Sequence, residues 1–231
     1  MTSAHSYWSV ILKDLPELAG GLYITLEVAA VAMVAGFFLG TILTMFRLSA
    51  WRPLAAFAQA YVTAFRAVPL VMVLLALFLV VPQFLQSVLH LDADTDIRRV
   101  SALIAFSLFE AAYYSEIIRA GIKSVPSGQA NAALALGMTT GQSMRLIVLP
   151  QALRAAAPLL LTQAVILFQD TSLVYVIGLN DFFTASSNAG ARDGTTVQLI
   201  LFAGACYFVV CTAMSAAVRG LHRRLDARFA H

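Results

Sequence analysis

Apolar residues in this chain gather into long runs that are separated by short polar stretches. A helix needs about 20 consecutive apolar residues to cross the hydrocarbon layer of a membrane. Five runs reach that length, at residues 22–46, 54–81, 100–120, 158–177 and 197–218. The pattern therefore predicts an all-α membrane protein with five transmembrane helices.

Residues 1–21 show a different pattern. Apolar side chains recur there at helical spacing, and the opposite face carries Lys13, Asp14 and Glu17. This arrangement predicts an amphipathic helix that lies in the membrane interface. The stretch lacks the basic start of a secretory signal, so we expect no cleavage. The expected organisation is an interfacial segment at 1–21, a transmembrane domain at 22–222 and a cytoplasmic tail at 223–231.

The second apolar run contains a break signal. Pro69 lacks a backbone N–H donor and kinks or interrupts a helix, and Arg66 precedes it as the one charge of that run. Interrupted helices inside a membrane are tolerated only where they line a cavity or are buried in protein. Arg66 is thus either part of a polar path or a structural charge near the inner interface.

Composition supports the membrane assignment, because 60% of the residues are hydrophobic and only 12% are charged, against roughly a quarter charged in soluble domains. Cys206 and Cys211 do not share a helix face, so we expect neither a disulfide nor a metal site from them. The histidines are too scattered for a metal cluster: His5, His90, His222 and His231. No feature indicates nucleic-acid binding.

The distribution of basic residues predicts the orientation. With the N-terminus in the periplasm, eleven of the 15 Lys and Arg residues flank the cytoplasmic ends of the spans. The four exceptions are Lys13, Arg98, Arg99 and Arg192. The positive-inside rule favours this orientation. It places the C-terminus and the loop at about 127–150 in the cytoplasm.

Ionisable residues within the spans are candidates for function, since an acid at mid-depth costs roughly 2.5 to 3.5 kcal/mol on insertion scales. Glu116 and Arg119 are three residues apart and are expected to pair on one helix face. Glu110 lies deeper, where Tyr113 or Tyr114 can donate a hydrogen bond to it or simply pack. The candidate substrate path comprises Arg66, Glu110, Gln169, Asp170, Thr171 and Ser172. A purely structural contact between Arg66 and Asp170 is the alternative.

The stretch QANAALALGMTTGQSMRLIVLP, residues 129–150, interrupts the apolar pattern. Small side chains suit a helix whose leading face docks closely in a groove of another protein, and Ala132, Ala133 and Ala135 provide them. Gly137 suits a helix C-cap and a turn with positive φ. The stretch therefore predicts a short docking helix followed by a turn.

The spacing of this stretch resembles E-A-A-x3-G-x9-I-x-L-P, the pattern of the cytoplasmic coupling loop in bacterial ABC-importer permeases. This chain matches every specified position except the first, where Asn131 replaces Glu. The resemblance implies that a coupling helix docks on an ATPase subunit. The implied coupling residues are Asn131, Ala132, Ala133, Gly137, Ile147, Leu149 and Pro150.

Further stretches resemble the polar amino-acid branch of these permeases, and in particular the permeases of bacterial glutamate/aspartate importers. They are FRAVPL at 65–70, FEAAYYSEIIRAG at 109–121, FQDTSLVY at 168–175 and RDGT at 192–195. The resemblance implies a type I ABC importer permease fold in the bacterial inner membrane, with glutamate or aspartate as substrate and glutamine as an alternative. The implied partners are a cytoplasmic ABC ATPase dimer, a homologous second permease subunit, a periplasmic amino-acid-binding protein and membrane lipid.

The chain lacks a phosphate loop, because Lys must follow Gly in that motif and neither Lys13 nor Lys123 does so. We therefore expect no catalysis and no cofactor in this chain, with ATP and Mg²⁺ bound by the ATPase. One alternative is an ion-coupled secondary transporter with Glu110 and Asp170 as relay carboxylates, although no inverted repeat supports it. An intramembrane hydrolase lacks a nucleophile and base.

Overall fold

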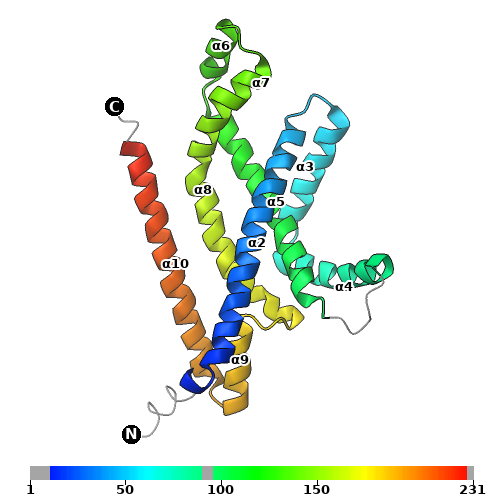
Figure 1. The fold of residues 1–231 in the computed structure, drawn as a ribbon, viewed down its shortest axis with the longest axis vertical. Helices are drawn as coiled ribbons and strands as arrows, with labels where there is room; N and C mark the ends of the chain where they lie inside the picture. The colour runs from blue at the N-terminus through cyan, green and yellow to red at the C-terminus, as the bar shows by residue number, and fades with distance from the viewer. Residues whose placement is uncertain (1–10, 90–95, 228–231) are drawn as a thin grey trace.

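The computed structural model describes residues 11–89 and 96–227, whose regular structure is entirely helical (Figure 1). The long helices are α2 (Leu15–Arg47), α3 (Arg52–Ala67), α4 (Leu70–Leu89), α5 (Arg98–Ser124), α8 (Leu149–Asp170) and α10 (Thr196–Ala227). The shorter ones are α6 (Ser127–Ala135), α7 (Thr140–Ser143), the π-helix η1 (Met144–Val148), the 3₁₀-helix η2 (Thr171–Ile177) and α9 (Phe182–Asp193). The predicted all-α fold is confirmed.

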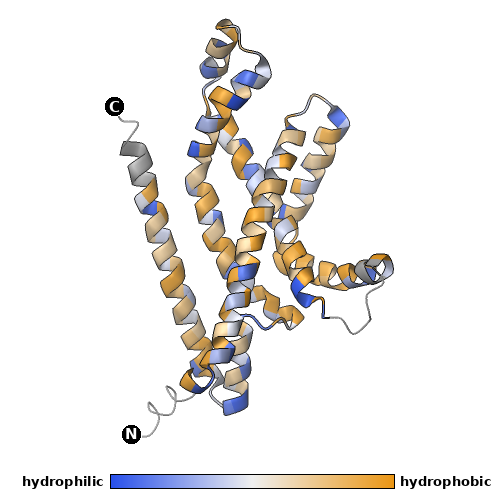
Figure 2. Cartoon of the chain, in the orientation of Figure 1, coloured by the Kyte–Doolittle hydropathy of each residue, from blue (hydrophilic) through white to orange (hydrophobic). Residues whose placement is uncertain are grey.

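Four spans in the described residues are long and apolar enough to cross a membrane, and the pair α3 and α4 supplies a fifth. Figure 2 shows apolar residues along most of these helices. The prediction of five spans is confirmed if this bent pair counts as one span, and the interruption predicted at Pro69 is present. Residues 54–81 do not form one nearly straight span, because α3 and α4 are bent by 110° and α4 runs sideways from the bundle (Figure 1).

The bend lies where Pro69 predicts an interruption. α3 ends at Ala67, and Val68 is extended with φ −106° and ψ 135°, the conformation that a following proline favours. The Pro69 carbonyl then accepts a hydrogen bond from the Met72 N–H at 2.9 Å as α4 begins. The broken helix is therefore a local consequence of the sequence.

The first helix begins earlier than the apolar run predicts. Pro16 occupies its first turn, where a missing N–H is harmless, and the helix continues from Leu15 through Gly21 to Arg47. The separate interfacial helix predicted over residues 1–21 is therefore wrong for residues 15–21, while residues 1–10 lie outside the described part. At the other end of the chain, α10 extends to Ala227, so the predicted tail begins inside a helix.

Helices α2 and α5 form the centre of the bundle and approach closely at two glycines. A Cβ at Gly36 would lie 2.7 Å from the Glu110 Cβ, and one at Gly40 would lie 2.8 Å from the Ala111 carbonyl oxygen. Any larger residue would clash here through its Cβ, which no rotamer change can move. Glycine at both positions therefore allows the backbones of the two helices to touch.

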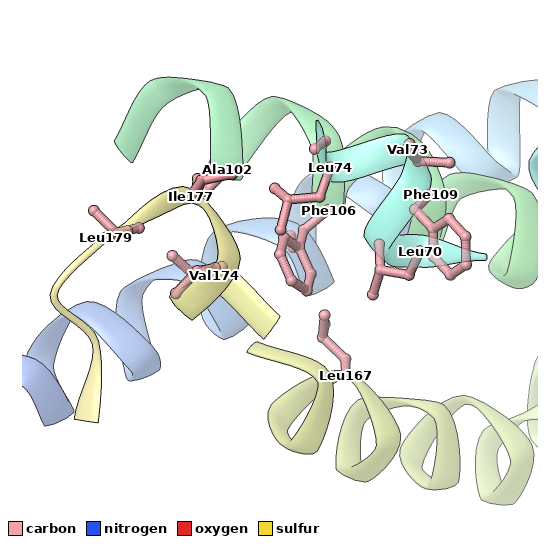
Figure 3. Close-up of a cluster of buried hydrophobic side chains, with 13 residues drawn as sticks. Leu70, Val73, Leu74, Ala102, Phe106, Phe109, Leu167, Val174, Ile177 and Leu179 are labelled. Carbon is pink, nitrogen blue, oxygen red and sulfur yellow. The ribbon is translucent and has the colours of Figure 1, made fainter. Parts of the chain in front are cut away.

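A buried apolar cluster surrounds the break between α3 and α4 (Figure 3). α4 contributes Leu70 and Leu74, α5 contributes Phe106 and Phe109, and α8 contributes Leu167. Val174 and Ile177 of η2 complete this side of the cluster. The packing holds the start of α4 against α5 and η2, so it fixes the direction in which the chain leaves the break.

The two ends of the molecule carry different loops (Figure 1). The α2–α3 connection, α6, α7 and the C-terminal end of α10 lie toward one end, and α9 lies with the start of α2 at the other. At the α9 end, Arg192 pairs with Asp14 at 2.7 Å and with Glu17 at 3.1 Å. These ion pairs tie α9 to the first turn of α2.

Candidate functional site

A cavity of about 460 Å³ opens beside the broken helix, within the size range of small-molecule sites. Its lining comes from the break and from the facing sides of α5 and α8: Arg66, Ala67, Val68, Pro69, Leu70, Phe109, Tyr113, Gln163, Ile166 and Asp170. Most of this wall is apolar. Its polar groups are a guanidinium, a carboxylate, an amide and a phenol.

Arg66 stands at the end of α3 with its side chain 44% exposed. Its guanidinium carbon lies 5.6 Å from the centre of the Tyr113 ring, a cation–π contact that orients the side chain. The nearest carboxylate is Glu116, at 3.9 Å between Nη1 and Oε2. Among the described residues, the positive charge of Arg66 therefore faces the cavity with a single long ionic contact.

Glu116 is held more tightly by two other arginines. The predicted pair with Arg119 forms, and Arg47 Nη1 lies 2.7 Å from Glu116 Oε2. The side chain of Arg47 is only 6% exposed. Arg47 is not recognisable from the sequence as a partner of Glu116, because it lies 69 residues away on α2.

Asp170 ends α8 and faces the same cavity as Arg66. Among the described residues no salt bridge joins the two, so the structural contact considered between them is absent, and Arg66 contacts Glu116 instead. Gln163 and Ile166 precede Asp170 on the same face of α8, at helical spacing. That spacing is the signal by which Gln163 was identifiable from the sequence.

The remaining path candidates are separated from this cavity. Gln169 lines a different hollow of about 480 Å³ with Tyr207 and Arg219. Thr171 is fully buried and donates to the Phe168 carbonyl, while Ser172 donates to the carbonyl of Gln169. The side chains of the polar run at 169–172 therefore do not face one common path.

Glu110 is 1% exposed and lies behind the cavity wall. Its Oε1 accepts a hydrogen bond of 3.1 Å from Nε2 of Gln163. Of the two alternatives for Tyr114, a hydrogen bond to Glu110 or simple packing, the structure shows packing, because the Tyr114 hydroxyl has no hydrogen-bond partner in the described residues. Glu110 therefore reaches the cavity only through Gln163.

The predicted docking helix is α6, and its end has the expected geometry. Gly137 has φ 84°, the Met138 N–H donates to the Ala133 carbonyl, and the Gly137 N–H donates to the Leu134 carbonyl. This pair of bonds is the Schellman C-cap, which favours glycine at the left-handed position. A capping box between Thr139 and Gln142 then starts α7.

The coupling candidates fall into two groups by exposure. Asn131, Ala132 and Gly137 are exposed on α6 and its turn. Ala133 is 4% exposed, so its assignment to the leading face is wrong, because α6 packs its inner side on η1 and α7. Ile147 and Leu149 are half-buried, and exposed Pro150 lies in the first turn of α8. In the second group, Ile147 belongs to η1, the element that packs against α6.

No group of three or more His, Cys, Asp or Glu side chains is placed to hold a metal ion within residues 11–89 and 96–227. His5, His90 and His231 lie outside these ranges. The chemistry of the described site rests on charge and hydrogen bonding.

A broken spanning helix beside a polar cavity is a feature of membrane transport proteins. The family model described as the binding-protein-dependent transport system inner membrane component matches residues 28–227, and the chain belongs to this family.

Two relatives illustrate the similarity. The glutamate/aspartate import permease protein GltK of Escherichia coli O6:H1 is 59% identical over 217 residues, which cover 94% of this chain and 97% of GltK. The arginine transport system permease protein ArtQ of Bacillus subtilis is 33% identical, with 95% and 97% covered.

A solved structure shows the same fold. A crystal structure of an amino acid ABC transporter superposes with a TM-score of 0.83 at 27% identity, covering 93% of this chain and 96% of that one. The chain is therefore a multi-pass permease with the type I ABC importer fold, whose transport cycle relies on a separate ATPase subunit.

Proposed function

We propose that this chain is a permease subunit of an ATP-driven importer that carries glutamate and aspartate across the bacterial inner membrane. The observation that carries the proposal is the 59% identity with a glutamate/aspartate import permease over 94% of the chain. The relatives whose names indicate arginine or glutamine transport are only 33% identical.

The chemistry of the cavity agrees with this substrate class. An acidic amino acid carries two carboxylates and one ammonium at neutral pH, and a guanidinium binds a carboxylate through two parallel hydrogen bonds. Arg66 presents such a group, and Asp170 presents the opposite charge to the same cavity. Because the Tyr113 ring holds Arg66 without neutralising it, the cavity retains a positive group for the substrate.

The proposed assembly contains a homologous second permease subunit, a cytoplasmic ABC ATPase dimer and a periplasmic amino-acid-binding protein. ATP and Mg²⁺ are bound by the ATPase in this proposal. The N-terminus faces the periplasm and the C-terminus the cytoplasm, since this orientation puts Arg47, Arg52, Lys123 and Arg145 on the inner side. These residues belong to helix ends and loops at the α6 end of the molecule.

α6 is the proposed contact with the ATPase. Leu136, next to Gly137, is 82% exposed at the tip, and an exposed apolar side chain of this size suits a protein interface. The Gln151 side chain links α8 to η1 and α6. Its Nε2 donates to the Ile147 carbonyl at 2.9 Å and to Gln129 Oε1 at 3.4 Å. Movement of α6 on the ATPase is thereby passed to α8, which lines the cavity.

The test is uptake of radiolabelled glutamate by proteoliposomes that contain both permeases, the ATPase and the binding protein. We expect uptake that requires ATP and is competed by aspartate. Uptake driven by a proton or sodium gradient without the ATPase would establish secondary transport instead. Preference for glutamine over glutamate would assign the importer to a neutral polar substrate.

A further inference from the structure

Gln163 is a polar side chain on the cavity wall that is oriented by a hydrogen bond to the buried Glu110. It is 8% exposed, lines the cavity with Asp170 and donates from Nε2 to Glu110 Oε1 at 3.1 Å. The sequence pattern had not assigned it to the site. Its position seven residues before Asp170 places both side chains on one face of α8.

Glu110 has little freedom to move. It is 1% exposed, and Gly36 of α2 approaches it so closely that a Cβ there would lie 2.7 Å from the Glu110 Cβ. A carboxyl oxygen accepts a hydrogen bond in either protonation state, whereas the nitrogen of an amide only donates. The buried Glu110 therefore keeps the Gln163 nitrogen on its own side.

The amide oxygen of Gln163 is left for the cavity. Among the described residues this oxygen accepts no hydrogen bond. It is also absent from the fully buried polar atoms that lack a partner, so it is accessible. An amide whose nitrogen is held in this way presents a directional acceptor to the cavity, which the Asp170 side chain also lines. Arg66, from the α3 side, presents donors to the same space.

We infer that the Gln163 carbonyl oxygen accepts a hydrogen bond from the substrate's ammonium group, and that Glu110 is the positioning residue that orients it. This inference rests on the proposed function. Asp170 attracts the ammonium by charge, Arg66 binds a carboxylate, and Gln163 fixes the direction of the ammonium. The three contacts together distinguish an amino acid from a dicarboxylate that lacks the amino group.

The experiment measures binding to the purified permease–ATPase complex without the binding protein, so that only the permease selects. The probes are radiolabelled glutamate and glutarate, which has the same two carboxylates but no ammonium. We expect Gln163→Leu to weaken glutamate binding about tenfold, the scale of one hydrogen bond to a charged group, and to leave glutarate binding unchanged. Glu110→Leu should have the same selective effect.

Glu110→Gln is the matched conservative variant. Its side-chain carbonyl still accepts from Gln163, so it should recover most of the glutamate affinity that Glu110→Leu loses. A merely structural role would instead lower glutamate and glutarate binding together, through the amount of folded complex. Retained glutarate binding serves as the folding control for every variant.

Three results would overturn the inference while wild-type uptake continues: unchanged glutamate binding in Gln163→Leu, an equal loss for both probes, or no glutamate binding by the wild-type complex alone. Failure of Glu110→Gln to recover affinity would remove the positioning role. If the complete wild-type importer takes up no acidic amino acid, the proposed function itself fails, and the two failures are thereby distinguished.

Discussion

Three guanidinium groups surround one carboxylate within the spanning bundle. Arg47 and Arg119 contact the two oxygens of Glu116, and Arg66 lies 3.9 Å from Oε2. One carboxylate cannot neutralise three cations, and a charge in a partly desolvated site attracts any anion strongly. The cluster therefore keeps an excess of positive charge, and Arg66, the most exposed of the three arginines, is the one that lines the cavity.

Asp170→Asn tests the charge opposite Arg66. We expect the variant to assemble normally and to raise the substrate concentration needed for half-maximal uptake, with a loss of roughly 1.5 to 3 kcal/mol from removing a charged hydrogen-bond partner. Uptake titrations normalised to the amount of complex measure it.

The matched control is Thr162→Val, because Thr162 is exposed on α8 and its hydroxyl donates only within its own helix, to the Pro158 carbonyl. Reduced abundance of Asp170→Asn with an unchanged half-saturation would assign Asp170 a structural role. An unchanged half-saturation at normal abundance would remove it from both roles.

At the scale of the helices, close backbone contacts at glycines determine much of the packing. Gly21 brings α2 against the loop before α9, where a Cβ would lie 2.6 Å from the Asp181 carbonyl oxygen. Gly121 brings α5 against α8, with a Cβ 2.6 Å from the Ala152 carbonyl oxygen. In a membrane, where lipid is as apolar as the helix surfaces, such close contacts supply much of the association energy.

Gly40→Ala tests the α2–α5 contact. Its Cβ would meet the Ala111 carbonyl oxygen, the Ser115 nitrogen and the Tyr114 Cβ at 2.8 to 2.9 Å. Since a rotamer change cannot relieve these contacts, the helices must separate, and we expect a loss of about 1 to 3 kcal/mol in the free energy of unfolding. Denaturant titration of the purified protein in detergent measures it.

Gly204→Ala is the control for that experiment, because nothing lies within 4 Å of its Cβ and alanine favours helix over glycine by about 1 kcal/mol. Equal or greater stability is expected there. If Gly40→Ala is as stable as this control, the close approach of α2 to α5 does not limit packing.

Asp181 caps α9 and joins three elements. Its buried carboxylate accepts from the Thr184 N–H and hydroxyl at 2.9 and 2.6 Å, and also from Thr25 of α2 and Tyr207 of α10 at 3.4 Å. Burial raises the pKa of Asp181 above its usual 3.8, although the hydrogen bonds from Thr184 and Tyr207 oppose the shift. The residue lies outside the spanning helices, between η2 and α9.

The raised pKa predicts a pH dependence of defined sign. The folded state binds the Asp181 proton more tightly than the unfolded chain, so this contribution to stability is complete below pH 3.8 and is lost as pH rises through the folded pKa. Wild-type stability should therefore fall more steeply from about pH 4 upward than that of Asp181→Asn. Thermal midpoints measured in detergent across pH 4 to 8 compare them, and parallel profiles would contradict the prediction.

Across the whole molecule, the cavity and the docking helix lie far apart and communicate through α5 and α8, which pack on one another. Alternating access requires two discrete arrangements of such rigid elements. In the proposed assembly α6 meets the ATPase, and the C-cap at Gly137 sets how α6 ends. Gln151 joins α6 to the helix that ends at Asp170. We therefore expect a change at Gly137 to affect coupling rather than insertion.

Gly137→Val tests this coupling. Nothing lies within 4 Å of a Cβ there, so the effect comes from the backbone: a side chain at φ 84° costs about 1 to 2 kcal/mol and more for a β-branched residue. We expect normal membrane insertion with reduced substrate-stimulated ATP hydrolysis in the assembled complex.

Gly141→Val is the matched control in the same loop. Its Cβ also meets nothing within 4 Å, and its backbone lies in the ordinary helical conformation of α7. Wild-type stimulation in Gly137→Val, or equal losses in the two variants, would show that the left-handed turn is not needed for coupling.

Much of the architecture was predictable because it depends on local physics. A membrane leaves no partner for an unpaired backbone group, so long apolar runs must be helices. Pro69 interrupts its helix by lacking a donor, Gly137 ends α6 by adopting positive φ, and Glu116 and Arg119 pair across one turn. Each of these features depends on residues within a few positions of one another.

Tertiary packing decided what local pattern leaves open. The sequence predicts a break at Pro69 but not its 110° bend, which depends on the cluster that receives Leu70 and Leu74. It predicts a polar run at 169–172, but the rotation of α8 against α5 turns Asp170 and Gln163 into the cavity and Gln169 away from it. Arg47 reaches Glu116 from 69 residues away. The sequence shows which residues share one face of a helix. Which way that face points depends on the helices it packs against.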